Sequence, residues 1–271
     1  MTSYQEAIQL ARQQKDGAIK ADSLHWMNLA GLFWLEEGEN PFGSDEDNKI
    51  SYPSFPEPVC GSFTLVNGQV FFKPAQGIEF TSNSPNLITR PLISDHNAEP
   101  DIIQVGSLVM KIIIRGGVPL IRMWDREAPS KTDFNGLKYY PVNEGYRVTA
   151  RFIPYDPPRT IKKTEVIGTE VQAVLLGQVQ FNLHGTDCVL QAEKSGEKLL
   201  LHFADGTNSK TTYGGGRRIY IPPPETDEFI LDFNLTDNWP CAYTPYATCP
   251  LVPQENRLPI SIEAGELKYH E

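Results

Sequence analysis

Two adjacent arginines at the start of a predicted strand carry the strongest chemical signal in this sequence. They follow the glycines of TTYGGGRRIYIP, after which Ile219 and Ile221 alternate toward a core. Because side chains alternate between the two faces of a strand, Arg217 shares the inward face with these isoleucines. An arginine cannot be neutralised by losing its proton, and an isolated buried charge is costly. We therefore expect Arg217 to be paired inside the protein.

A carboxylate on a later strand is the predicted partner of this arginine. In EFILDFN, alternation places Asp232 and Asn234 on the face opposite the two phenylalanines. A pair between Arg217 and Asp232 would either lock two strands together or hold a small anion, such as a ligand carboxylate, through two parallel hydrogen bonds. In the second case, nearby tyrosines would form the walls of the site. The predicted ligand-binding residues are Arg217, Asp232, Asn234, Tyr213, Tyr243 and Tyr246.

The proline-rich stretch NWPCAYTPYATCPLVPQENRLP covers residues 238–259. Proline fixes φ and removes a backbone donor, so we predict that this stretch crosses the structure as a rigid, ordered loop. It would either plug the structure or close over the open end of a barrel. The second arrangement would turn Tyr243 and Tyr246 toward a ligand beside Arg217. A last strand is expected over 258–263.

Non-catalytic binding of a small anionic or carboxylate-bearing molecule in the C-terminal β half is the leading functional hypothesis. An enzyme is the first alternative, because a hydrolase could use Asp205, Asp232 or Glu266 as its general base. Such a site would hold carboxylates with raised pKa values in one cleft. A protein-interaction module that uses the N-terminal strands is the second alternative. The sequence itself specifies no reaction.

No cofactor or metal site is predicted. The glycines of TTYGGGRR lead into a strand rather than a helix N-terminus, so neither a P-loop nor a dinucleotide fingerprint is complete. Cys241 and Cys249, with seven residues between them, lack the second ligand pair of a zinc knuckle. We interpret both cysteines as small buried apolar residues.

The charge balance limits the classes of partner. The chain of 271 residues has a formal net charge of −10, which repels phosphate backbones and anionic membrane surfaces. A small molecule is therefore the expected partner, rather than nucleic acid or a membrane, and the oligomeric state stays open. The first residues lack a secretory apolar run, and we interpret the four cysteines as reduced thiols. These features predict a cytoplasmic protein.

Hydrophobic periodicity predicts an all-β fold. Residues 3–20 follow helical spacing, and a second short helix is expected over 24–30. The period then changes to two: SLVMKIIIRGGVPLIRMWD predicts a hairpin around two glycines, and QVQFNLHGTDCVLQAEKSGEKLLLHFADGT predicts an antiparallel meander. We expect an N-terminal helical segment over 1–30, a β-sandwich over 31–130 and an antiparallel barrel-like meander over 131–271, with one continuous domain as the alternative.

Four stretches resemble the bacterial family known as domain of unknown function 1684. They are GLFWLEEGENPFGSDEDNKI, KTDFNGLKYYPV, TTYGGGRR and LDFNLTDNWPCAYTPYATCPLVPQENRLPISIEAGE. The resemblance runs from about residue 25 to the end of the chain, and its C-terminal part is the most specific. This family has no established activity. The resemblance therefore implies kinship and leaves the chemistry to be argued from the residues.

Overall fold

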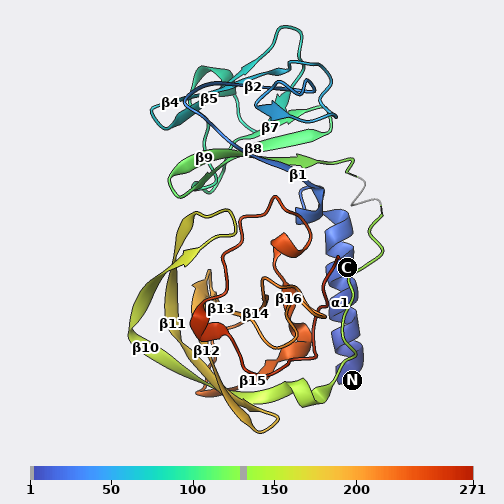
Figure 1. Ribbon diagram of the computed structural model, residues 1–271, viewed down its shortest axis with the longest axis vertical. Helices are drawn as coiled ribbons and strands as arrows, with labels where there is room; N and C mark the ends of the chain where they lie inside the picture. Colours follow the sequence, from blue (N-terminus) through green and yellow to red (C-terminus); the bar gives the residue numbers. More distant parts are fainter. Residues whose placement is uncertain (1–2, 129–132, 271) are drawn as a thin grey trace. The chain divides into compact units, whose positions relative to one another are not determined.

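The computed structural model describes residues 3–128 and 133–270. Contacts within the chain divide it into two compact units, which are described separately (Figure 1). One unit is Asp22–Phe134. The other joins Met1–Ala21 to Asn135–Glu271, so the N-terminal helix belongs with the C-terminal half of the chain.

The unit that contains the C-terminal half is built on one seven-stranded antiparallel sheet. Its strand order is β15-β10-β11-β12-β13-β14-β16, in which β10 to β14 follow one another as a meander. The predicted meander is confirmed, but β15 and β16 form two separate edges, so the sheet stays open rather than closing into a barrel. The strands are β10 (Arg147–Thr164), β11 (Glu170–Leu183), β12 (Thr186–Ser195), β13 (Lys198–Phe203), β14 (Arg217–Ile221), β15 (Glu228–Asp232) and β16 (Asp237–Asn238).

The turn between β11 and β12 illustrates how the sequence forms this meander. Leu183 pairs with Thr186 across two residues, His184 and Gly185, whose φ angles are 51° and 84°. A tight hairpin of this kind needs positive φ at both central positions, because only then does its twist match that of the strands. Alternation then buries Val179 on the inner face of β11, as its period-two pattern predicts.

The C-terminal segment packs against the inner face of this sheet. Ile262 and Ala264 belong to the same buried cluster as the sheet residues, and Figure 1 shows this segment in red within the curve of the sheet. The strand expected over 258–263 was wrong, because this stretch is irregular. Pro259 has no N–H to offer, and the N–H of Ile262 donates to Asp205 Oδ1 (3.2 Å) instead of to a neighbouring strand.

The proline-rich stretch is a loop, as predicted. Beyond β16 it contains two short 3₁₀ helices, η5 (Pro240–Ala242) and η6 (Gln254–Asn256), and isolated bridges. The buried amide of Asn256 holds the loop to the sheet. Its Nδ2 donates to the carbonyls of Gln191 (3.0 Å) and His202 (2.8 Å), and its Oδ1 accepts from the N–H of Gln191 (2.7 Å). The side chain of Asn256 therefore satisfies backbone groups that a neighbouring strand would otherwise pair with.

The unit Asp22–Phe134 is the predicted sandwich of two sheets. One sheet has the order β1-β9-β8-β7-β6 and the other β3-β2-β4-β5. The predicted short helix before them is a single 3₁₀ turn, η1 (Trp26–Asn28). The strands are β1 (Leu29–Trp34), β2 (Gly38–Gly43), β3 (Ile50–Ser51), β4 (Gly61–Val66), β5 (Gln69–Pro74), β6 (Thr81–Ser82), β7 (Ile102–Val105), β8 (Leu108–Arg115) and β9 (Val118–Asp125).

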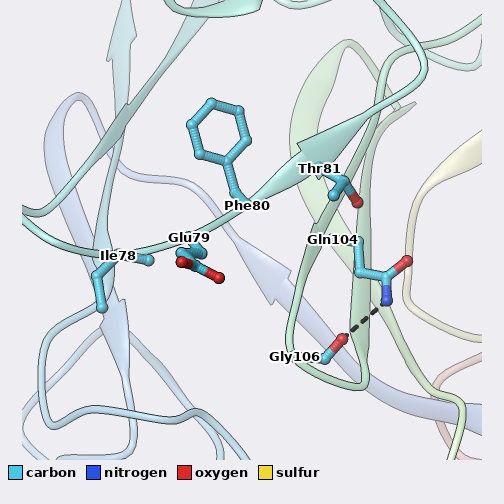
Figure 2. A pocket seen from close by; sticks show the side chains of 6 residues that line it. All are labelled: Ile78, Glu79, Phe80, Thr81, Gln104 and Gly106. Carbon is cyan, nitrogen blue, oxygen red and sulfur yellow. Dashed lines mark hydrogen bonds between the residues drawn. The ribbon is translucent and has the colours of Figure 1, made fainter.

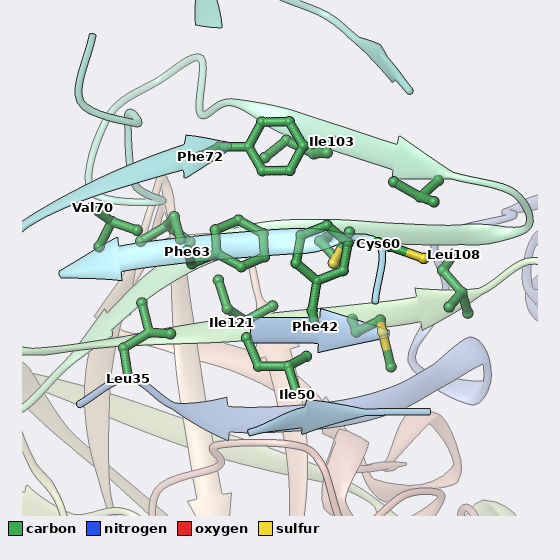
Figure 3. Packing of buried hydrophobic residues seen from close by; sticks show 14 of the residues in the cluster. Leu35, Phe42, Ile50, Cys60, Phe63, Val70, Phe72, Ile103, Leu108 and Ile121 are labelled. Carbon is green, nitrogen blue, oxygen red and sulfur yellow. The ribbon is translucent and has the colours of Figure 1, made fainter. Parts of the chain in front are cut away.

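Side chains from both sheets of this sandwich fill one core (Figure 3). Phe42, Phe63 and Phe72 form its aromatic centre, with ring centroids 5.2 to 6.0 Å apart. The predicted hairpin is also confirmed: Gly116 and Gly117, with φ of 56° and 82°, connect β8 to β9. Glycine adopts such angles without a Cβ clash.

A fully buried ion pair joins the seven-stranded sheet to the C-terminal segment. Arg217 points inward, as predicted, and is 0% exposed. Its Nη2 donates to Asp205 Oδ2 (2.7 Å) and to the carbonyl of Ile262 (2.7 Å), and its Nη1 donates to the carbonyl of Ala264. The predicted partner, Asp232, was wrong. It ends β15 at one edge of the sheet, whereas Asp205 follows β13, the direct neighbour of β14.

We predict that Asp205→Ala destabilises the protein by about 3–5 kcal/mol, because it leaves the Arg217 guanidinium as an uncompensated buried charge. Urea unfolding followed by tryptophan fluorescence measures this change. Lys162→Ala is the matched control. It breaks an ion pair with Glu170 whose two side chains are 70% and 62% exposed, and it should cost less than about 1 kcal/mol. Equal losses in the two variants would contradict the role assigned to the buried pair.

Candidate ligand-binding site

A small pocket lies between helix α1 (Tyr4–Ala21) and the segment that leads from β15 into β16. Its volume is about 190 Å³. Its walls combine aliphatic carbon with cationic, carboxylate, amide and hydroxyl groups, a mixture that is typical of sites for small polar ligands. The lining residues are Ala11, Arg12, Lys15, Tyr139, Asn234, Leu235, Thr236 and Asp237.

Helix α1 carries two cations on the face that it packs against the rest of its unit. Arg12 and Lys15 follow Ile8 and precede Ile19 at spacings of three or four residues, so all four share one face. Ile8, Arg12 and Ile19 are buried. Burial of the apolar stripe stabilises the helix on the protein and brings the two cations into the interior with it.

The guanidinium of Arg12 is buried but only partly hydrogen bonded. The residue is 9% exposed, Nη1 donates to the carbonyl of Tyr140 (3.1 Å), and the guanidinium carbon lies 4.4 Å from the ring centre of Tyr139. Nε and Nη2 have no partner among residues 3–128 and 133–270. Desolvation lowers the pKa of Arg12, but the group stays charged at neutral pH. Nε and Nη2 form one edge of the guanidinium, the geometry that binds a carboxylate through two parallel bonds.

Two hydroxyl groups of the same pocket also have no hydrogen-bond partner within the described part of the chain. They are Tyr139 Oη and Thr236 Oγ1, and Thr236 is fully buried. Burial raises the pKa of Tyr139, and the nearby Glu266 carboxylate acts in the same direction. The Tyr139 hydroxyl therefore remains protonated and can donate. Leaving buried polar atoms unpaired is costly, so their concentration around one pocket indicates a site for a polar ligand.

Lys15, unlike Arg12, is already paired. Its Nζ donates to Glu266 Oε2 (2.8 Å) and to Asp237. Burial alone would lower the pKa of Lys15, but the two carboxylates outweigh it and raise the pKa. The other oxygen of Glu266, Oε1, accepts hydrogen bonds from Asn238 Nδ2 (2.8 Å) and from the hydroxyl of Tyr243 (2.5 Å). This network ties α1 to the end of the chain.

Several of the predicted site residues lie in or next to this pocket. Asn234 lines it. Asp232 lies beside Asn234 and accepts from its N–H (2.9 Å). Glu266 and Tyr243 lie behind Lys15 in the network described above. The sequence therefore predicted part of the region around this pocket, but not the side chains whose polar atoms are unpaired there.

The other predicted residues lie elsewhere. Both Nη atoms of Arg217 donate to protein acceptors, and its Nε alone has no partner among the described residues. Arg12, which lines the pocket, has two such atoms, Nε and Nη2. Tyr213 contacts Cys241. Tyr246 is not among the lining residues of the pocket.

The three carboxylates proposed as general bases are all engaged by protein donors. Asp205 accepts from Arg217, and its side chain is 0% exposed. Asp232 accepts from the hydroxyl of Tyr4 (2.7 Å), and the side chain of Glu266 is 1% exposed. A general base needs an oxygen within reach of a substrate proton. This geometry therefore gives no support to a hydrolase.

Four residues of this pocket and its network were not predicted from the sequence: Arg12, Lys15, Tyr139 and Thr236. A signal for the first two was present, because both cations fall on the apolar face of the predicted helix, where a charge needs a special reason. Tyr139 and Thr236 stand in irregular segments, and no local pattern distinguishes them. Their role depends on being brought together with α1.

The sandwich unit has a hollow of its own, which is a weaker candidate (Figure 2). Ile78, Glu79, Phe80, Thr81, Gln104 and Gly106 line it. The amide of Gln104 already donates to the carbonyl of Gly106 (2.8 Å), and Glu79 is exposed to solvent. Polar groups that are satisfied or solvated do not call for a ligand.

A larger groove, of about 670 Å³, lies between β10 and the proline-rich loop. Lys163 is one of its lining residues, and its buried Nζ contacts Glu193 Oε1 (2.5 Å) and His202 Nδ1 (3.4 Å). Nε2 of His202 lies 3.4 Å from the carbonyl of Gly215, which fixes Nε2 as the protonated nitrogen of a neutral ring. Burial, followed by the charge of Lys163, lowers the pKa of His202 to about 3. These three groups satisfy one another and form a structural cluster.

The chain belongs to the family described as protein of unknown function, DUF1684, whose model matches residues 132–267. The N-terminal stretch GLFWLEEGENPFGSDEDNKI, which carried part of the resemblance, lies outside the matched region, as does α1. Tyr139, Thr236 and Asp237 lie inside it.

One solved structure with detectable similarity is the solution NMR structure of an uncharacterized protein from Haloarcula marismortui. It is 30% identical, the match covers 52% of this chain and 80% of that chain, and the TM-score is 0.44. Similarity at this score supports no conclusion about the site. No curated protein gives a significant match. Within the described residues, no helix has the length and apolar character needed to cross a bilayer.

We predict that His202 makes stability depend on acid pH. Because its folded pKa is about 3 and the ordinary value is ~6.5, the unfolded chain binds a proton that the folded chain resists, and stability is lost as pH falls through this window. The difference in unfolding free energy between wild type and His202→Gln should shrink from pH 7 to pH 4, by on the order of 1 kcal/mol per pH unit. Urea titrations at each pH measure it, and a constant difference would contradict the prediction.

Proposed function

We propose that this protein binds a small carboxylate-bearing molecule in the pocket beside α1 and does not change it chemically. The supporting observation is the unpaired edge of Arg12. A ligand carboxylate placed against Nε and Nη2 would supply both missing acceptors through one bidentate contact. Because Arg12 is 9% exposed, water screens this contact weakly and the attraction is stronger than at a surface arginine.

The remaining walls favour a ligand with a second polar group. The hydroxyls of Tyr139 and Thr236 can each donate or accept, and the side chain of Asp237, which is 31% exposed, can accept from a hydroxyl or an amine. The volume of about 190 Å³ limits the ligand to a few carbon atoms. A short hydroxy acid or amino acid fits this combination of size and polarity.

Local charge favours a singly charged acid. Lys15 is compensated by Asp237 and Glu266, so the attraction for an anion rests on Arg12. The same two carboxylates would repel a second negative charge on the ligand. This balance disfavours phosphate and dicarboxylates in comparison with monocarboxylates.

Binding without catalysis is supported by the state of the acidic side chains. Asp205, Asp232 and Glu266 already accept hydrogen bonds from protein donors, and a protein that only binds needs no free base. The alternative of a protein-interaction module on the N-terminal sandwich stays a prediction.

We predict that Arg12→Met weakens binding of acetate, glycolate and glycine by roughly 10–100-fold, since it removes two charge-assisted hydrogen bonds. Titrations of the full chain followed by NMR chemical shifts measure the affinities. Acetamide, a neutral molecule of nearly the same shape as acetate, should bind wild type much more weakly than acetate does.

Two further variants separate charge from geometry. Arg12→Lys keeps a positive charge but loses the two-pronged edge, so it should also weaken binding. Arg151→Met removes an arginine whose side chain is 61% exposed and should leave binding unchanged. The proposal fails if wild type binds none of the three probes, or if Arg12→Met binds them as tightly as wild type does.

A further inference from the structure

Two cysteines of the proline-rich loop lie in contact with each other. The N–H of Cys241 donates to the Sγ of Cys249 (3.3 Å), so the backbone of one cysteine contacts the thiol of the other. Cys249 is buried with Leu200, Trp239 and Ala247, and Cys241 is partly exposed at the edge of this cluster. The eight-residue separation in sequence is thus closed by the fold of the loop.

The surroundings of Cys241 favour its thiolate form. The hydroxyl of Tyr213 hydrogen bonds to its sulfur, and the guanidinium of Arg218 adds positive charge nearby. Arg218 is held by the rings of Trp239 and Tyr220, at 4.8 and 5.3 Å from their centres. Hydrogen bonding from Cys249 lowers the pKa of Cys241 most, Tyr213 and Arg218 act in the same direction, and desolvation opposes them. The pKa of Cys249 is raised, first by its bond to Cys241.

We infer that Cys241 and Cys249 form a redox-active dithiol that reduces small hydroperoxides, with Cys241 as the attacking thiolate and Cys249 as the resolving thiol. The assignment follows from exposure and contacts. Cys241 is the more exposed residue and has the Arg218 guanidinium nearby, whereas Cys249 is buried and its Sγ lies 3.3 Å from the backbone nitrogen of Cys241. Nucleophilic thiols occur in such electropositive, partly exposed environments.

The reaction has two steps. In the first, the Cys241 thiolate attacks one oxygen of the hydroperoxide, an S–O bond forms, the O–O bond breaks, and the leaving oxygen takes up a proton to become water or an alcohol. In the second, Cys249 loses its proton and attacks the Cys241 sulfur, an S–S bond forms, the S–O bond breaks, and the released hydroxide takes up a proton and leaves as water. The two thiols give up two electrons and the peroxide takes up both.

Partial burial points to a small oxidant. Cys241 packs against the edge of an apolar cluster, so hydrogen peroxide reaches it more easily than a bulky disulfide does. Cys60 and Cys188 are buried as well, but burial raises their pKa values and leaves them as inert thiols. Cys60 and Cys188 therefore serve as unreactive reference thiols within the same chain.

The test uses the full reduced chain and hydrogen peroxide. Free thiols counted after unfolding should fall from four to two, and peptide mass spectrometry should find Cys241 joined to Cys249. Chymotryptic cleavage after Tyr243 or Tyr246 separates the two cysteines unless a disulfide connects them. In Cys249→Ser, a sulfenic acid should persist on Cys241 and be trapped by dimedone.

Two further variants test whether the reaction is specific to Cys241 and depends on Tyr213. Cys188→Ser should form the same disulfide at the wild-type rate, and Tyr213→Phe should react roughly fivefold more slowly because one hydrogen bond to the thiolate is lost. In Cys188→Ser, the rate of disulfide formation should rise with pH and reach half of its plateau well below pH ~8.5, the ordinary pKa of a cysteine thiol. The inference is overturned if peroxide oxidises Cys60 or Cys188 as fast as Cys241, if no bond between Cys241 and Cys249 forms, or if the rate rises only above pH 8.5.

Discussion

The need to pair buried cations organises the unit that contains the seven-stranded sheet. A guanidinium or ammonium removed from water must regain its lost interactions from protein groups, or the fold loses stability. Arg217 regains them from Asp205 and two carbonyls, and Lys15 regains them from Glu266 and Asp237. Arg12 regains them only in part, because its Nε and Nη2 have no partner among the described residues, and Arg12 lines a pocket. The cations that are bound to carboxylates stabilise the structure, and the one with two unpaired donor atoms marks the candidate site.

The end of the chain supplies most of the partners in this arrangement. Its carbonyls accept hydrogen bonds from Arg217, and its Glu266 accepts one from Lys15. Its prolines prevent it from pairing as a strand, so its backbone polar groups remain available to side chains. The site and the dithiol are both products of this irregular segment and its neighbours. Function in β proteins is commonly carried by such loops on a rigid sheet, because loops tolerate irregular backbone and polar side chains.

The prediction of Arg217 as an inward-facing arginine was correct, and the prediction of its partner was wrong, for different physical reasons. Inward orientation follows from pleat alternation within one strand, which is a local property. The partner depends on the order of strands in the sheet: Asp232 and Arg217 lie on strands far apart in that order, whereas Asp205 follows the neighbouring strand. The family match likewise fixes kinship over residues 132–267 without fixing chemistry.

Local sequence patterns specify the class of the fold, the helix over its first residues, the hairpins at Gly116 and His184, and the irregular course of the proline-rich loop. Each depends on interactions among residues close in the chain. Long-range packing determines that the sheet stays open, that α1 packs with the C-terminal half, and that Arg12 meets Tyr139 and Thr236. The last two outcomes depend on contacts between residues more than a hundred positions apart, such as Arg12 with Tyr140. The first depends on pairing between strands that are not consecutive in the chain, such as β10 with β15. Local periodicity carries no information on either.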